Sequence, residues 1–121
     1  MSFHWNDKEP IYIQLKDMIR EMILKGELKT GEALPSVRQI AAEYQLNPIT
    51  VSKSWQLLAD EELVEKRRGL GMFVTENAQQ KVTSEVQQKF IENDWPDILR
   101  TIQQLNLDIQ PLIKSLEEIG S

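Results

Sequence analysis

Apolar residues near the start of the chain recur with the period of a helix. After Pro10 they follow i, i+4, i+7, i+8 spacing: Ile11, Leu15, Met18, Ile19, Met22 and Ile23. Such spacing places the apolar side chains on one helix face, and proline suits the first helical position. The pattern therefore predicts a helix between Pro10 and Gly26. The turn-rich connection from Gly26 to Pro35 has room for a very short strand at Ala33 and Leu34.

A second, shorter helix is predicted directly after this connection. Ser36 and Gln39 have the spacing of a capping box, in which each side chain bonds the other residue's backbone N–H. The helix ends near Gln45, and its inward-facing side is expected to be Val37, Ile40, Ala41 and Tyr44.

A third helix begins only two residues later. Asn47 is a good N-cap and Pro48 suits the first helical position. The spacing places Val51, Trp55 and Leu58 on a buried face. The opposite, exposed face then carries small polar groups, one base and one apolar residue: Ile49, Ser52, Lys53 and Gln56. Two short helices joined by a tight turn form a helix-turn-helix pattern.

A β-hairpin is predicted after the third helix. Leu63 and Val64 pair with the run from Met72 to Val74, and a basic, glycine-bearing tip from Lys66 to Gly71 joins them. A hairpin in this place is a wing. Because Gly69 and Gly71 lack a third glycine and a following helix, the tip is a tight turn and not a nucleotide-binding loop.

The last part of the chain is again helical in pattern. Ala78, Val82, Val86 and Phe90 recur every four residues, and Asn93 or Asp94 is expected to cap a helix that has Pro96 near its start. Two heptad-like stripes follow, one over Trp95, Ile98, Ile102 and Leu105 and one over Ile109, Leu112, Leu116 and Ile119. Apolar stripes on such short helices need a partner. Either they pack within the chain, or they dimerise it through Ile98, Ile102, Leu105, Leu112 and Leu116.

Together these elements predict a mostly α fold with a small β-hairpin. We expect a winged helix-turn-helix DNA-binding domain over residues 1–75 and a short helical dimerisation region over residues 76–121. A chain of 121 residues can bury only a modest core, so the second part has no room to enclose a sizeable pocket.

Composition narrows the classes of function. No apolar run approaches the roughly 18 residues of a membrane span, and the N-terminus lacks the pattern of an export signal, so a cytoplasmic location is expected. The chain has no cysteine and a single histidine, His4. Disulfides, thiolate zinc sites and a catalytic triad are therefore not expected. We expect no enzyme activity, no metal and no cofactor.

The chain is acidic as a whole, but its acidic residues are not evenly distributed along the sequence. The net charge is −5 and the pI about 4.9, yet residues 35–74 balance five Lys and Arg against five Asp and Glu. Residues 75–121 carry four against eight. No acidic residue occurs from Asn47 to Ala59, and Asp60, Glu61 and Glu62 come at the far end of the third helix. The front of that helix can therefore approach phosphates without a repelling carboxylate.

Four separated motifs resemble the DNA-binding domain of the GntR family of bacterial transcription regulators. They are PIY-x-Q, G-x-L-x-x-G-x-x-LPS-x-R, N-x-x-TVSK and RRGLGMFV, within residues 9–74. The resemblance implies that operator DNA is contacted by Arg38, by the front of the recognition helix and by the wing tip: Ile49, Thr50, Ser52, Lys53, Arg67, Arg68 and Gly69. Ser54, Trp55 and Met72 depart from the family's common alanine, tyrosine and threonine, and they concern packing and the wing strand.

The tail indicates the subfamily. Only 47 residues follow Val74, whereas larger family members carry a much longer second domain, so the chain resembles the short-tailed YtrA-type members. This resemblance implies a homodimeric repressor that binds an inverted-repeat operator, with an association to transporter genes. It identifies no small-molecule effector.

Less specific interpretations of the same residues remain open at this point. Asn47 and Pro48 could simply cap a core helix, and Lys66 to Arg68 could be a solvated turn. Arg38 could be a structural arginine that pairs with Glu43 or another acid. The whole winged domain could serve as a protein-interaction module, which would not bind duplex DNA in a salt-dependent way.

Overall fold

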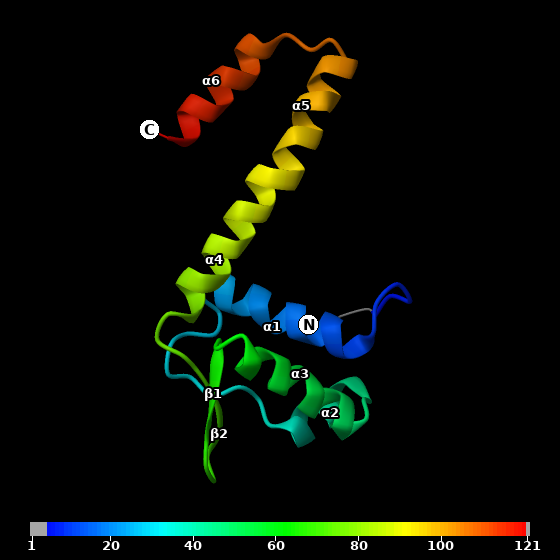
Figure 1. The fold of residues 1–121 in the computed structure, drawn as a ribbon, viewed down its shortest axis with the longest axis vertical. Coiled ribbons are helices and arrows are strands. Elements are labelled where there is room, and N and C mark those ends of the chain that lie inside the picture. Colours follow the sequence, from blue (N-terminus) through cyan, green and yellow to red (C-terminus); the bar gives the residue numbers. More distant parts are fainter. Residues whose placement is uncertain (1–4, 121) are drawn as a thin grey trace. The chain divides into compact units, whose positions relative to one another are not determined.

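The protein is mostly helical, with one two-stranded antiparallel sheet, as the sequence predicts (Figure 1). The computed structural model describes residues 5–120, so His4 lies outside the described residues. In chain order the elements are α1 (Ile11–Leu24), α2 (Val37–Tyr44), α3 (Pro48–Asp60), β1 (Val64–Arg67), β2 (Gly71–Val74), α4 (Ala78–Lys89), the π-helical turn η1 (Phe90–Asp94), α5 (Trp95–Gln104) and α6 (Ile109–Ile119). No helix within the described residues has both the length and the apolar composition of a membrane span.

The chain forms two compact units, Met1–Ser84 and Glu85–Ser121. The domain boundary that we predict from the sequence follows Thr75, whereas the first compact unit continues into α4. Ala78 and Val82 explain the difference, because both are buried in the core of the first unit.

The core of the first unit is formed mainly by α1 and α3. The positions expected to face inward on α3 are all buried, whereas on α1 Ile11, Met18 and Met22 remain half-buried. The hairpin closes the core with Leu63, Val64 and Val74. The buried apolar residues are Leu15, Ile19, Ile23, Leu28, Leu34, Ile40, Ala41, Val51, Trp55, Leu58, Leu63, Val64, Val74, Ala78 and Val82.

Both predicted caps of the helix-turn-helix are present. The Ser36 hydroxyl accepts from the Gln39 N–H at 3.1 Å, and the Gln39 side chain accepts from the Ser36 N–H at 3.0 Å. The Asn47 side chain accepts from the Ile49 N–H at 2.9 Å. Between the helices, Gln45 adopts a left-handed conformation with φ 55°, which ends α2. The tight turn thereby sets where α3 begins.

The hairpin is in register from Val64 opposite Val74 to Arg67 opposite Gly71. Gly69 and Gly71 have φ of 78° and 111°, conformations that favour glycine in the tight tip. The expected short strand at Ala33 and Leu34 is reduced to a single bridge, between Ala33 and Phe73. The Leu34 N–H also donates to the Met72 carbonyl at 2.8 Å, which attaches the connection to the edge of β2.

In the second unit the predicted cap near Asn93 is wrong. Asp94 has helical angles, φ −72° and ψ −42°, and its side chain makes no cap hydrogen bond. The chain passes from α4 to α5 through η1, where the Trp95 N–H donates to the Phe90 carbonyl five residues earlier. Pro96 has no N–H to continue the α-helical ladder, and the wider π-helical turn just before it lets the helix pass the proline without a break. The Phe90 and Trp95 rings pack at 6.5 Å between centroids.

Candidate nucleic-acid interface

The exposed face of α3 carries the side chains that the sequence predicts. Ser52, Lys53 and Gln56 are exposed, Thr50 is half-buried, and Ile49 retains 75% of its accessible surface. Val51, Trp55 and Leu58 are buried on the other side of the helix. The hydroxyl, amide and ammonium groups of this face can all donate hydrogen bonds to DNA.

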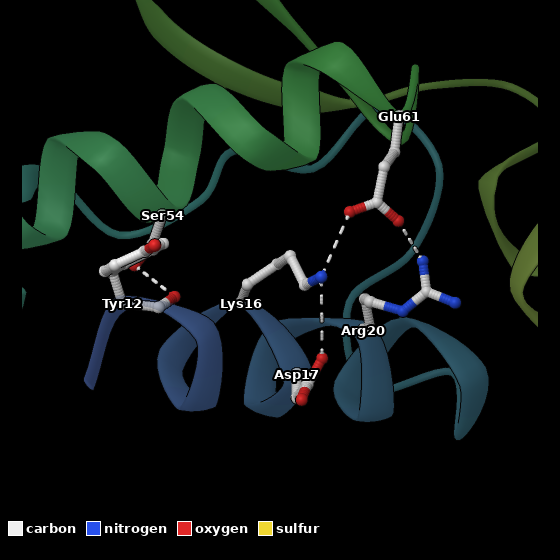
Figure 2. A network of polar contacts seen from close by, with 6 residues as sticks. All are labelled: Tyr12, Lys16, Asp17, Arg20, Ser54 and Glu61. Carbon is white, nitrogen blue, oxygen red and sulfur yellow. Dashed lines mark hydrogen bonds and ion pairs between the residues drawn. The ribbon is translucent and has the colours of Figure 1, made fainter. Parts of the chain in front are cut away.

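Ser54 and Trp55, which replace the alanine and tyrosine common in the GntR family, hold α3 against neighbouring segments by hydrogen bonds. The buried Ser54 hydroxyl lies 2.8 Å from the Tyr12 carbonyl oxygen of α1, as Figure 2 shows, and 3.2 Å from that of Thr50. The Trp55 indole N–H donates to the Pro35 carbonyl at 3.1 Å, just before α2. Both departures from the family pattern therefore concern packing, as expected.

Two of the three acids at the end of α3 are paired with bases of other elements. Glu61 accepts from Arg20 and lies 3.5 Å from Lys16, so two bases of α1 hold one carboxylate (Figure 2). Glu62 pairs with Lys81 at 3.2 Å, and Asp60 accepts from Gln56 at 3.0 Å. The ion pairs offset the charges of Glu61 and Glu62, whereas Asp60 keeps its charge beside Gln56.

The motif PIY-x-Q supplies two contacts that we did not assign from the sequence. The Lys53 ammonium lies 4.0 Å from the centroid of the Tyr12 ring, a cation–π distance. The buried Gln14 side chain accepts from the Asn6 N–H and donates to the carbonyls of Asn6 and Glu9. The motif draws attention to Tyr12 and Gln14 in the sequence. Only the tertiary structure shows that Tyr12 of α1 contacts Lys53 of α3.

Arg38 lies in the first turn of α2 with an exposed side chain. Within residues 5–120 it makes no hydrogen bond or ion pair, so the alternative pairing with Glu43 is absent there. Its guanidinium is available to an external acceptor.

The two arginines at the wing tip differ in their surroundings. The Arg67 guanidinium lies 3.3 Å from the Glu65 carboxylate and 4.3 Å from the centroid of the Phe73 ring, so it is engaged within the wing. Arg68 is exposed and has no ion-pair partner among the described residues. Gly69, beside it, allows the turn to approach another surface closely.

A groove of about 500 Å³ separates the wing from α2 and α3. Its polar lining includes the cap residue Ser36, Gln39 of α2, Ser52 and Gln56 of α3, and Lys66 of β1. No carboxylate lines it. A second hollow, of about 540 Å³, is lined instead by Glu62, Glu65 and Glu76 together with Lys66 and Lys81.

The chemistry of this surface is that of binding. It presents hydroxyls, amides and cations, which suit the recognition of phosphates and base edges. Among residues 5–120 no group of three or more His, Asp or Glu side chains is placed to hold a metal ion.

Comparison with known proteins agrees with this geometry. Residues 11–74, just over half of the chain, match the family described as bacterial regulatory proteins, gntR family. The HTH-type transcriptional repressor YtrA of Bacillus subtilis (strain 168) is 32% identical over 112 residues, which cover 93% of this chain and 85% of the relative.

Solved structures extend the likeness to the whole fold. A transcriptional regulator from Oenococcus oeni has a TM-score of 0.75 at 25% identity and covers 100% of this chain and 99% of its own. YtrA from Sulfolobus acidocaldarius, a GntR-family transcription factor, has a TM-score of 0.58 at 26% identity. The match covers 88% of this chain and 100% of the Sulfolobus chain. These relatives are regulators and not enzymes, as expected for this chain. The chain belongs to the GntR family of bacterial regulatory proteins, and it is a DNA-binding transcription regulator.

Proposed function

We propose that the protein is a cytoplasmic repressor that binds an inverted-repeat operator in duplex DNA as a homodimer. The observation that carries the proposal is the front of α3, where exposed donors stand without any acidic residue from Asn47 to Ala59. The name of its Bacillus subtilis relative, a YtrA-type repressor, supports repression over activation. The YtrA-type resemblance extends the proposal to the control of transporter genes.

The proposed contact surface has three parts. Arg38 contributes a free guanidinium from α2, and the front of α3 enters the major groove, where base edges can be distinguished. The wing tip reaches the neighbouring backbone or minor groove. The full set is Arg38, Ile49, Thr50, Ser52, Lys53, Arg67, Arg68 and Gly69.

We assign dimerisation to the second unit. Every residue from 85 to 120 is exposed or half-buried in the single chain, including apolar side chains of α5 and α6. Ile98, Leu105 and Leu116 are exposed, while Ile102 and Leu112 are half-buried. A second copy offers the same faces, so a two-fold interface would remove both sets from water. Two linked winged domains would also make the second half-site contact effectively intramolecular.

Selection of bound sequences from random duplex DNA tests the proposal. A repressor of this kind should enrich an inverted repeat with half-sites about one helical turn or slightly more apart. Binding of the enriched duplex should weaken steeply as salt rises, because phosphate contacts release counterions. No enriched sequence, together with binding that salt does not affect, would favour a protein-interaction module instead.

A further inference from the structure

The two neighbouring bases of β1 lie on opposite faces of the wing. Side chains alternate along a strand, so Glu65 and Arg67 share one face and Lys66 takes the other. In the register of the hairpin, Glu65 stands opposite Phe73 and Lys66 opposite Met72. Arg67 contacts both Glu65 and Phe73 on its own face. Lys66 and Met72 line the groove between the wing and the helix-turn-helix.

We propose that this groove receives the sugar-phosphate backbone of the operator and that Lys66 of β1 contacts a phosphate there, in addition to the contacts of the wing tip. The inference deepens the proposed function and rests on it. It adds a residue that neither the motifs nor the resemblance assigns to the interface.

Charge makes a DNA strand the fitting occupant. No carboxylate lines the groove, and Lys66 has no ion-pair partner within residues 5–120, although it also borders the second hollow, where Glu62, Glu65 and Glu76 lie. Arg67, in contrast, already has Glu65 at 3.3 Å, which offsets its attraction for a phosphate. The Ser36 cap at the start of α2 also lines the groove, but the capping box already bonds the Gln39 N–H, so this helix end adds less than Lys66 to the attraction of a phosphate.

The groove is also continuous with the proposed reading surface. Ser52, which projects from the front half of α3, forms part of its wall. A strand whose bases meet α3 therefore passes next to Lys66 before it reaches the wing tip. Trp55, Leu70 and Met72 supply apolar surface against which a sugar can rest. The volume of about 500 Å³ lies within the roughly 300–1,000 Å³ range of sites that take a small molecule, enough for one nucleotide's sugar and phosphate.

The matched pair Lys66→Gln and Lys29→Gln tests the assignment. Each variant loses one positive charge, but Lys29 is an exposed residue of the connection after α1 and does not line the groove. We measure the affinity of the full-length protein for its selected operator and for an unrelated duplex over a series of salt concentrations. Lys66→Gln should weaken binding on both duplexes and reduce the salt slope by about one, because a phosphate contact carries no sequence information. Lys29→Gln should leave the slope like that of the wild type.

A second measurement locates the contact on the DNA. Single phosphates of the operator are replaced by uncharged methylphosphonates, one position at a time. One replacement in each half-site should weaken binding of the wild type and of Lys66→Arg but not of Lys66→Gln. The assignment would be overturned if Lys66→Gln had the same salt slope as the wild type, or if the two glutamine variants lost affinity equally. It would also be overturned if no phosphate replacement distinguished the wild type from Lys66→Gln. A wild type that binds no duplex would instead refute the proposed function itself.

Discussion

At the scale of single residues, the position of α3 depends on a residue of α1 that lies outside the proposed contact surface. Tyr12 contacts α3 twice, through its carbonyl oxygen at Ser54 and through its ring at Lys53. The ring limits the positions that the Lys53 ammonium can take, because a cation over an aromatic face is attracted by its negative charge density. The lysine side chain is therefore partly ordered in the free protein, so a contact of Lys53 with DNA, as proposed, would cost less side-chain entropy.

Replacement of Tyr12 by leucine should weaken operator binding. An exposed cation–π contact contributes about 0.5–1 kcal/mol, so we expect a loss of a few fold in affinity, measured by titration of labelled operator. Tyr12→Phe keeps the ring and should bind like the wild type. In a Lys53→Ala background, Tyr12→Leu should have no further effect. Equal losses with and without Lys53 would show that Tyr12 acts through packing alone.

Ser52→Glu should abolish operator binding while leaving the protein folded. The side chain is exposed on α3, so the added carboxylate meets the phosphate backbone and leaves the core untouched. We expect the midpoint of thermal unfolding to match that of the wild type, since exposed substitutions change stability by about 0.5 kcal/mol or less. Ser52→Gln, of similar size without the charge, is the control. A glutamate variant that binds operator normally would exclude Ser52 from the interface.

At the scale of elements, the contact between α1 and α3 is held at both ends by polar groups. Ser54 meets Tyr12 at one end, and Glu61 meets Lys16 and Arg20 at the other (Figure 2). Leu15, Ile19 and Leu58 contribute buried apolar surface from the same two helices. This arrangement fixes the position of α3 on α1 and keeps the Glu61 charge away from the interface.

Glu61→Gln should reduce the stability of the protein. Its side chain is 31% exposed and its partners less, so the loss should fall between that of a surface pair and a buried one, about 1–2 kcal/mol of unfolding free energy. Glu62→Gln is the matched control, because the Glu62 side chain is 80% exposed and its partner Lys81 has a side chain that is 40% exposed. Urea unfolding of both variants measures the difference. Equal midpoints for the two would show that the pairing of Glu61 adds nothing to the stability.

At the scale of the whole molecule, the second unit exposes its apolar side chains to solvent in the single chain. The first unit has a continuous core, whereas residues 85–120 contain no buried side chain. A helix with an apolar stripe gains little stability until that stripe is packed. We therefore expect the second unit to reach its full stability only in the dimer, with its stability dependent on protein concentration.

Leu105→Asp should dissociate the dimer and weaken binding to a duplex with two half-sites. Leu105 is 63% exposed, so a charge there is tolerated in the single chain but not in an apolar interface. Sedimentation at micromolar concentration and an operator titration measure both effects. Gln104→Asp, at the neighbouring exposed position, adds the same charge as a control.

A deletion that tests the same coupling should remove residues 85–121 and keep the buried start of α4. A monomeric variant with undiminished affinity would contradict the dependence of binding on dimerisation. A wild type that sediments as a monomer would contradict the dimer.

The sequence alone determined the elements of the first unit and the exposed face of α3. Helical spacing, the Ser36 capping box and the Asn47 cap act between residues at most four apart, so they can be recognised in the sequence, and the structure has each of them. The family motifs placed the candidate contacts for the same reason, since each motif is a short local segment.

Only the tertiary structure decided which groups come together from distant positions. The contact of Tyr12 with Lys53, the pairing of Glu61 with α1 and the placement of Lys66 in the groove depend on packing and on strand register. The helix that passes Pro96 through η1 was also missed, because a proline preceded by good capping residues usually begins a helix. Local patterns specify which groups an element presents, whereas the partners of those groups are specified by contacts between elements far apart in the chain.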